Sequence, residues 1–154
     1  KKTKRWNINF HPGPPEYPGI GCFNFAIYNS SNDYGCTANI MEPRVDTGKI
    51  IAVNRFSIGK NEDVYSLSLK TYKYLFQLFK VVVDNIYKEN DLPYSDELWS
   101  RKPYKRKDLE NLCQIKEQMN EEEVNKRIRA TFFKGKPAPY IEIFNKKFEY
   151  NPDR

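Results

Sequence analysis

The chain has 154 residues, of which 39% are hydrophobic and 30% charged, and its formal net charge is +6. This composition is typical of a folded domain and excludes wholesale disorder, collagen-like repeats and a membrane-spanning helix. The three cysteines are odd in number and widely spaced, with no Cys-x-x-Cys pair. We therefore expect neither a zinc knuckle nor a thioredoxin-type centre, and we expect a reducing, cytoplasmic setting.

The chain opens on a short basic segment. Residues 1–5 carry neither an initiating methionine nor an apolar stretch, so they do not predict a signal peptide. A strand-like segment follows at once. Because a natural domain rarely begins so abruptly, we expect this chain to be the later part of a longer protein.

The first elements alternate between regular and stiff segments. Residues 6–10 alternate apolar and polar side chains, the period-two pattern that predicts a strand. Residues 11–19 hold four prolines and two glycines, and they predict a stiff loop because proline removes backbone donors. Residues 20–28 predict a short helix. Three apolar residues would share one of its faces: Ile20, Phe23 and Ile27.

Two strands and a long helix follow. Residues 35–41 and 49–56 predict the strands, which a loop over residues 42–48 joins. Residues 63–89 give the strongest helix prediction, because apolar positions recur every three or four residues. These positions are Val64, Leu67, Thr71, Leu75, Leu78, Val82 and Ile86. The apolar faces are wide, so we expect this helix to be covered on more than one side.

The rest of the chain predicts smaller elements. A polar connection over residues 90–107 leads to a short helix over residues 108–113. Asn120 is the predicted N-cap of a further helix that ends near Thr131, and Glu123 is expected to reach back in a capping box. The closing segment alternates on both sides of a turn at Asn145 and Lys146, which predicts a β-hairpin.

Three polar residues are candidates for acyl-transfer chemistry. His11 is the only histidine and the natural proton carrier near neutral pH, although a loop histidine bonded to a backbone carbonyl is an alternative. Asn9 lies two residues earlier and therefore points to the same face of a strand. Asp46 lies in the second loop. An amide would stabilise an oxyanion, an imidazole would move a proton and a carboxylate would orient the imidazole.

The order of these patterns is specific. An Asn-x-His pattern at residues 9–11 ends a strand, a Gly-x-Thr strand follows at residues 35–37, and Asp-Thr-Gly stands at residues 46–48. Over roughly residues 6–60, this order resembles the catalytic half of the folate-dependent formyltransferases. In that family the aspartate follows the histidine by about three dozen residues, as it does here.

The resemblance implies an α/β fold: part of a formyltransferase-like open sheet with flanking helices, plus a C-terminal helix and β-hairpin. Residues 1–98 would form the C-terminal part of the catalytic core, and residues 99–154 an appendage packed on it. The family's dinucleotide-like portion, which helps to hold the folate, lies upstream of the Asn-x-His strand and is not in these residues. No Gly-x-Gly-x-x-Gly motif is present.

Two features are similar to one branch of the family, the nucleotide-sugar N-formyltransferases. After His11 the usual Ser-Leu-Leu-Pro is replaced by Pro-Gly-Pro-Pro-Glu-Tyr-Pro-Gly. The ending, from Arg129 through the closing hairpin, resembles the tails of these sugar enzymes, whereas the transfer-RNA enzymes add a substantial further domain. The hairpin of the sugar enzymes is used in dimer contacts, which implies a homodimer, although covering its own core is an adequate alternative.

The implied reaction is formyl transfer from 10-formyltetrahydrofolate to the amino group of a nucleotide-linked sugar, within one-carbon metabolism and polysaccharide biosynthesis. Asn9 and a protonated or proton-sharing His11 would stabilise the oxygen of the tetrahedral centre, by about 3–4 kcal/mol per donor. His11, paired with Asp46, would take the proton from the attacking nitrogen. No ligand cluster is visible, so no metal is expected, and no membrane partner is implied.

Further residues carry weaker signals. Tyr17 would stack on or bond the sugar nucleotide, or would close the stiff loop onto the core. Arg44 would contact the folate glutamate or a diphosphate, or would be a solvated loop charge. Arg129 is expected to brace its helix against the core.

Other functions stand as alternatives. A methionyl-tRNA-type or other formyltransferase, a hydrolase that deformylates the folate, or a non-catalytic fragment would fit the same motifs. A basic nucleic-acid-binding module would use the net charge together with the 11 tyrosines and 10 phenylalanines. Because the basic residues are spread along the chain and interleaved with acidic ones, we expect no nucleic-acid partner.

Overall fold

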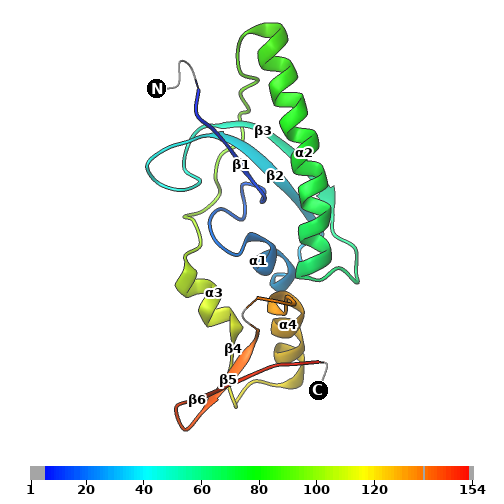
Figure 1. Ribbon diagram of the computed structural model, residues 1–154, viewed down its shortest axis with the longest axis vertical. Coiled ribbons are helices and arrows are strands. Elements are labelled where there is room, and N and C mark those ends of the chain that lie inside the picture. Colours follow the sequence, from blue (N-terminus) through cyan, green and yellow to red (C-terminus); the bar gives the residue numbers. More distant parts are fainter. Residues whose placement is uncertain (1–5, 137, 153–154) are drawn as a thin grey trace.

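The computed structural model describes residues 6–136 and 138–152, which form two three-stranded sheets with helices around them (Figure 1). The prediction for residues 1–5 lies outside the described residues. The larger sheet contains β1 (Ile8–His11), β2 (Asp33–Ile40) and β3 (Ile50–Ser57), antiparallel in the order β1-β2-β3. The predicted α/β class with open sheets and flanking helices is confirmed.

Strand β2 is the centre of this sheet, and all but its terminal residues are buried. Cys36 and Ala38 are 0% exposed and belong to the same core cluster as Leu78 and Val82 of the long helix. The strands predicted over residues 35–41 and 49–56 are confirmed, and their observed ends differ from the predicted ones by at most two residues. The pairing of β2 with β3 slips beside Asn39, where a β-bulge changes the register.

Helix α2 (Val64–Glu89) lies along the sheet and contacts all three of its strands (Figure 1). Its start is fixed by a reciprocal capping box. Asp63 accepts a hydrogen bond from the Ser66 N–H at 2.8 Å, and the Ser66 hydroxyl oxygen accepts one from the Asp63 N–H at 2.9 Å. The helix predicted over residues 63–89 is confirmed.

Cover on more than one side of α2 is only partly confirmed. Near its start, α2 also contacts the shorter helices α1 (Cys22–Tyr28) and α4 (Glu121–Thr131) (Figure 1). Along its length, six apolar side chains stay 49–87% exposed: Tyr65, Leu69, Tyr72, Phe76, Val81 and Tyr87. The sequence pattern counts apolar residues on a helix face, but it does not reveal which of them have a neighbour to pack against.

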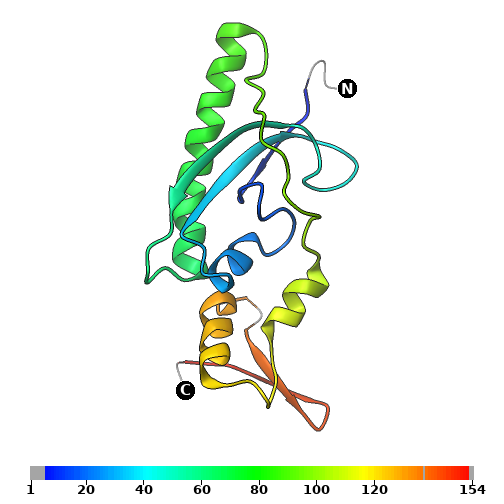
Figure 2. The same ribbon diagram turned by 180° about the vertical axis from the view of Figure 1, so that it is seen from behind.

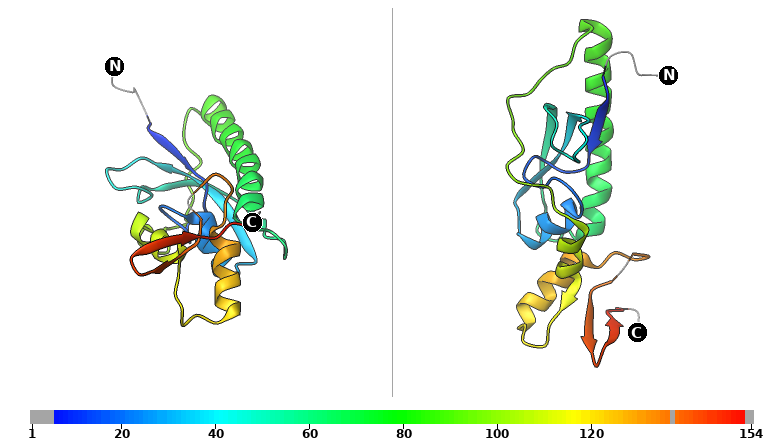
Figure 3. Two further views of the ribbon diagram at one scale, coloured as in Figure 1. Left: turned by 60° about the horizontal axis from the view of Figure 1, so that its bottom comes forward. Right: turned by 90° about the vertical axis from the view of Figure 1, so that its left-hand side faces the viewer.

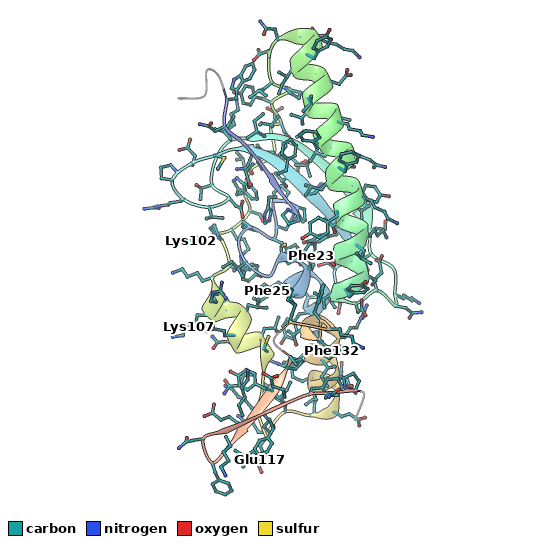
Figure 4. The ribbon with its side chains drawn as sticks, viewed as in Figure 1. Phe23, Phe25, Lys102, Lys107, Glu117 and Phe132 are labelled. Atoms are coloured by element: carbon teal, nitrogen blue, oxygen red, sulfur yellow. The ribbon has the colours of Figure 1, made fainter. Side chains whose placement is uncertain are left out.

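Helix α1 (Cys22–Tyr28) corrects one predicted helix face. Gly21 has a φ of 78°, so the helix begins only at Cys22, and Ile20 stays outside it at 43% exposure. Its buried residues are Cys22, Phe25, Ala26 and Ile27. Figure 4 labels Phe23 and Phe25 on this helix: Phe23 meets Tyr72 of α2 edge to face, whereas Phe25 stacks on Tyr104.

The segment after α2 returns along the sheet before the chain enters its C-terminal part (Figure 2). That part contains α3 (Arg106–Cys113), β4 (Gln114–Ile115), α4 (Glu121–Thr131), β5 (Tyr140–Ile143) and β6 (Lys146–Glu149). The strands form the second sheet, in which β4 runs parallel to β5 and the β5–β6 hairpin is antiparallel (Figure 3). Strand β4 is too short for the sequence pattern to predict.

The predicted hairpin and helix cap are confirmed with two corrections. The hairpin turn lies one residue earlier than predicted, at Phe144 and Asn145, whose φ values of 51° and 58° suit a primed turn. Asn120 caps α4 by accepting from the Glu123 N–H at 2.9 Å. The Glu123 side chain does not reach back. It accepts instead from Arg127 and from the Tyr28 hydroxyl.

Helix α4 ties the C-terminal part to the larger sheet and its helices. Arg129 donates to the backbone oxygens of Lys60 and Glu62 at 2.7–3.0 Å, so its predicted bracing role is confirmed. The Asn24 amide of α1 donates to the Ala130 carbonyl at 2.8 Å. Among the described helices, none combines the length and apolar character that crossing a bilayer requires.

Candidate functional site

The end of β1 places Asn9 and His11 on one face of the sheet, as alternate residues of a strand must be. Asp46 approaches from the loop between β2 and β3 with a φ of 48°, a left-handed conformation that aspartate tolerates better than most residues. The loop closes tightly on β2, because a Cβ on Gly48 would lie 1.9 Å from the Ile40 carbonyl oxygen. Glycine at this position therefore lets the loop bring Asp46 to β1.

The three predicted catalytic side chains meet at this point. His11 Nδ1 lies 3.2 Å from Asp46 Oδ2, and Asn9 Nδ2 donates to Asp46 Oδ1 at 3.1 Å. The Gly19 N–H also donates to Asp46 Oδ2, at 2.8 Å. His11 and Asp46 are only 5% and 4% exposed. Their electrostatic attraction is therefore screened less than that of a surface pair.

Both ring nitrogens of His11 face oxygen atoms that can only accept. Nδ1 faces the Asp46 carboxylate, and Nε2 lies 2.9 Å from the backbone carbonyl oxygen of Tyr17. A neutral imidazole donates from one nitrogen, whereas an imidazolium donates from both. The arrangement therefore fits a positively charged His11 held between a carboxylate and a carbonyl.

Two side chains of strand β2 hold the proline-rich loop that follows His11. The Thr37 hydroxyl donates to the Gly13 carbonyl at 2.8 Å, and the Tyr34 hydroxyl donates to the Pro12 carbonyl at 2.9 Å. These bonds hold carbonyls that have no partner within the loop, where proline cannot donate. The Tyr17 carbonyl is thereby held against the His11 ring.

The segment that follows α2 contacts both the proline-rich loop and the loop that carries Asp46, and the sequence analysis did not identify these contacts. The Trp99 ring meets the His11 ring edge to face, with centroids 5.8 Å apart, and its Nε1–H donates to the Gly48 carbonyl at 2.8 Å. Tyr104 lies opposite Gly19 in a parallel β-bridge: its N–H donates to the Pro18 carbonyl at 2.9 Å, and its carbonyl accepts from the Ile20 N–H at 3.0 Å. Lys102, from the same segment, and Lys107 of α3 are exposed and lie at the outer edge of the molecule in Figure 4.

Asn39 is a second residue that the sequence analysis missed. It lies directly opposite Asn9 in the β1–β2 ladder, is 1% exposed, and accepts a hydrogen bond from Asn9 Nδ2 at 3.2 Å. The only signal for it would have been the strand register, which one sequence does not give.

The two predicted substrate contacts occupy different environments. The Tyr17 ring is buried in the core beside Tyr34 and Tyr104, and its hydroxyl bonds to Ser31. This position agrees with the loop-closing alternative, and a substrate contact by the Tyr17 side chain stays a prediction. Arg44 is exposed on the Asp46 loop, and its carbonyl accepts from Thr47 at 2.9 Å. Its contact with a substrate also stays a prediction.

The thiol nearest this site is not a nucleophile at neutral pH. Burial raises the pKa of Cys22 to about 11, and the charge of Asp46 contributes in the same direction. Cys22 Sγ donates to the Pro12 carbonyl instead. Among residues 6–136 and 138–152, no three acidic, histidine or cysteine side chains gather as a metal site would require.

Comparison with known proteins gives one family match. Residues 1–82 match the family model described as Formyl transferase. The fold is similar to a 4-N formyltransferase from Francisella tularensis, with a TM-score of 0.81 and 23% identity over 94% of this chain and 61% of that one. It is also similar to an N-formyltransferase from Helicobacter canadensis solved with folinic acid and dTDP-3-aminofucose. That match has a TM-score of 0.69 and 25% identity over 91% of this chain and 52% of that one.

The similarity in sequence is more local. The chain is 25% identical over 77 residues to the phosphoribosylglycinamide formyltransferase of Haemophilus influenzae, a match that covers 49% of this chain and 36% of that protein. The chain thus spans 61% or less of the length of these three relatives.

Proposed function

This chain belongs to the formyl transferase family, and on that premise we propose that it transfers a formyl group from 10-formyltetrahydrofolate to the amino group of a nucleotide-linked amino sugar. The observation that carries the proposal is the meeting of Asn9, His11 and Asp46 at the end of β1. Together they supply a donor for an oxyanion, a proton carrier and a group that orients the carrier, which is what acyl transfer to an amine needs.

The reaction makes one bond and breaks one. The amine nitrogen bonds to the formyl carbon, the bond from that carbon to N10 of the folate breaks, and one proton passes from the amine to N10. Asn9 donates an N–H to the formyl oxygen as negative charge develops on it, an interaction worth about 3–4 kcal/mol. A positively charged His11 supplies a second, charge-assisted donor.

His11 is also the proposed proton carrier. It first donates its Nε2 proton to the departing N10, and as a neutral imidazole it then accepts the proton that the amine loses. Asp46 stays paired with His11 Nδ1 during the whole reaction, so Nε2 is the nitrogen that exchanges protons. The Tyr17 carbonyl, bonded to Nε2 at 2.9 Å, must give up this bond when the substrates bind.

The proposed acceptor follows from the extent of the likeness. The Helicobacter protein solved with dTDP-3-aminofucose matches 91% of this chain, so the match includes residues beyond α2. This structural likeness to a protein solved with an amino-sugar nucleotide supports an amino sugar as the acceptor. The local identity to the Haemophilus protein makes phosphoribosylglycinamide the second candidate.

The remaining proposals concern binding and assembly. Arg44 is proposed to bind a diphosphate or the folate glutamate with its guanidinium, and its exposure and its place in sequence close to Asp46 support this proposal. Tyr17 stays a proposed substrate contact on the strength of its place in the loop. Exposed Phe144 and Phe148 on the hairpin support its proposed use in a homodimer. We retain the cytoplasm as the proposed location, with no nucleic-acid or membrane partner.

A panel of acceptors tests the proposed function. The full-length protein is incubated with 10-formyltetrahydrofolate and with a dTDP-linked amino sugar, with phosphoribosylglycinamide, or with no acceptor, and the products are identified by mass spectrometry. We expect a formylated sugar. Formylation of the glycinamide alone would favour the second candidate, and folate deformylation without any acceptor would identify a hydrolase. The absence of all three products would contradict formyl transfer.

A further inference from the structure

Both N–H groups of the Asn9 side-chain amide form hydrogen bonds in this structure. Its Nδ2 atom carries two hydrogens, and it donates to two acceptors, Asn39 Oδ1 at 3.2 Å and Asp46 Oδ1 at 3.1 Å. From this geometry, and resting on the proposed function, we infer that Asn39 is a positioning residue. It holds the Asn9 amide so that an N–H, and not the amide oxygen, is available to the formyl group.

Asn39 is itself firmly held. It is 1% exposed, and its own Nδ2 donates to the Ile40 carbonyl at 2.9 Å, which leaves Oδ1 turned to Asn9. The β-bulge at Ala38 and Asn39 shifts the ladder beside this residue, and bulges of this kind re-aim side chains next to functional sites. The orientation of the Asn39 amide is therefore set by contacts outside the site.

This orientation excludes the opposite rotamer of Asn9. If the Asn9 amide turned over, its oxygen would face Asn39 Oδ1 and Asp46 Oδ1, and neither of these atoms carries a hydrogen when the carboxylate is ionised. Two acceptor pairs would replace two hydrogen bonds in a half-buried position. Asn39 and Asp46 together thus select the donor face of Asn9.

The two bonds have different roles in the proposed reaction. The bond to Asn39 lies within the sheet and joins directly opposed residues of β1 and β2, so it can persist with substrate bound. The bond to Asp46 uses a carboxylate that also contacts Gly19 and His11 in the site. The hydrogen on the Asp46 side is therefore the one available to the formyl oxygen, which takes the place of Asp46 Oδ1 as its acceptor, while the bond to Asn39 prevents rotation of the amide.

Two substitutions at one position test this role. Asn39→Leu keeps the size of the side chain but removes the acceptor, whereas Asn39→Asp keeps an oxygen opposite Asn9 and loses only the donor to the Ile40 carbonyl. We expect kcat of Asn39→Leu to fall about 10- to 100-fold with KM for both substrates within about threefold of wild type, because Asn9 acts on the transition state. Asn39→Asp should keep kcat within about tenfold of wild type. Ser68→Ala, which removes a buried hydroxyl from α2 at 4% exposure, is the control and should leave kcat unchanged.

A second measurement does not need activity. The side-chain amide protons of Asn9 are assigned by NMR from their loss in Asn9→Ala. In Asn39→Leu we expect one of them to shift upfield and to exchange faster with water, whereas in Asn39→Asp both should stay protected. Unchanged Asn9 signals in Asn39→Leu, or a wild-type kcat, would overturn the inference. If wild-type protein transfers no formyl group to any acceptor, the proposed function fails, and the NMR result then decides the positioning role alone.

Discussion

At the scale of single residues, Asp46 organises the site. Its carboxylate accepts hydrogen bonds from the Asn9 amide and the Gly19 N–H, and its Oδ2 lies 3.2 Å from His11 Nδ1. A carboxylate can do this because it has two oxygens, whereas an amide has one acceptor oxygen and a donor group. Its negative charge would also balance the His11 ring whenever that ring is protonated. The side chain and its charge should therefore matter separately from the shape of the loop.

Asp46→Asn separates these contributions. Asparagine also tolerates the left-handed backbone at φ 48°, so the loop should keep its conformation. We expect kcat for formyl transfer to fall by about 100-fold or more. His11 loses its charged partner, and the new side-chain NH2 group faces an N–H donor where a carboxylate oxygen stood. The far-UV circular dichroism spectrum at 25 °C should match wild type, which shows that the variant is folded when kcat is measured. A variant that keeps the wild-type kcat would contradict a role for the charge.

Prediction from the sequence reached the residues of the motif but not their neighbours. Asn9, His11 and Asp46 were identifiable because their order along the chain is specific. Asn39 and Trp99 were not, since the first reaches the site through strand register and the second by a return of the chain after α2. Neither relation leaves a local pattern in one sequence.

At the scale of elements, the proline-rich loop depends on contact with the segment before α3. Gly19 has a φ of 88°, and a Cβ there would lie 2.3 Å from the Tyr104 carbonyl oxygen. The Gly19 N–H also bonds to Asp46. Glycine is therefore required both by the positive φ and by the close approach of Tyr104, and the loop, the segment and the Asp46 carboxylate are joined at this residue.

Gly19→Ala and Gly135→Ala form a matched pair. Gly135 has a similar φ of 81°, but nothing lies within 4 Å of its added Cβ. We expect Gly135→Ala to lower the free energy of unfolding by about 1–2 kcal/mol, the cost of a left-handed L-residue. Gly19→Ala should cost clearly more and should also lower kcat. Urea denaturation measures both variants, and equal losses of stability would show that the contact with Tyr104 does not constrain the loop.

Element prediction succeeded where the periodicity was long and failed at ends and short pieces. Helix α2 and the hairpin followed their patterns, and Asn120 capped α4 as expected. Ile20 lies outside helix α1 because Gly21, with a φ of 78°, is not helical and the helix begins only at Cys22. Glu123 left the capping box because Arg127 and Tyr28 offered it charged and hydroxyl donors. Tertiary contacts decided these cases.

At the scale of the whole molecule, buried groups couple stability to alkaline pH. Burial raises the pKa of Cys22 to about 11 and that of Cys36 to about 12, and it holds the pKa of Tyr34 well above its usual value. In the unfolded chain the thiols ionise near their ordinary value of 9.0. The folded state therefore binds protons more tightly, and its stability is complete below about pH 9 and is lost as the pH rises toward 11 or 12.

The expected loss is roughly 1 kcal/mol per buried thiol between pH 9 and 10. Urea unfolding at pH 8 and at pH 10 measures it in wild type and in Cys36→Ala, which removes one of the two thiols. The variant starts from lower stability because of its cavity, but its change between the two pH values should be smaller. The same free energy of unfolding at both pH values in wild type would contradict the buried, protonated state of these groups.

The central claim is that His11 moves the proton during formyl transfer, and chemical rescue of His11→Ala tests it most directly. Single-turnover transfer is followed in the full-length protein with and without added imidazole. We expect the rate of His11→Ala to fall about 100- to 10,000-fold and to rise again with imidazole concentration, since the small base replaces the missing ring. A wild-type rate in His11→Ala would contradict the account.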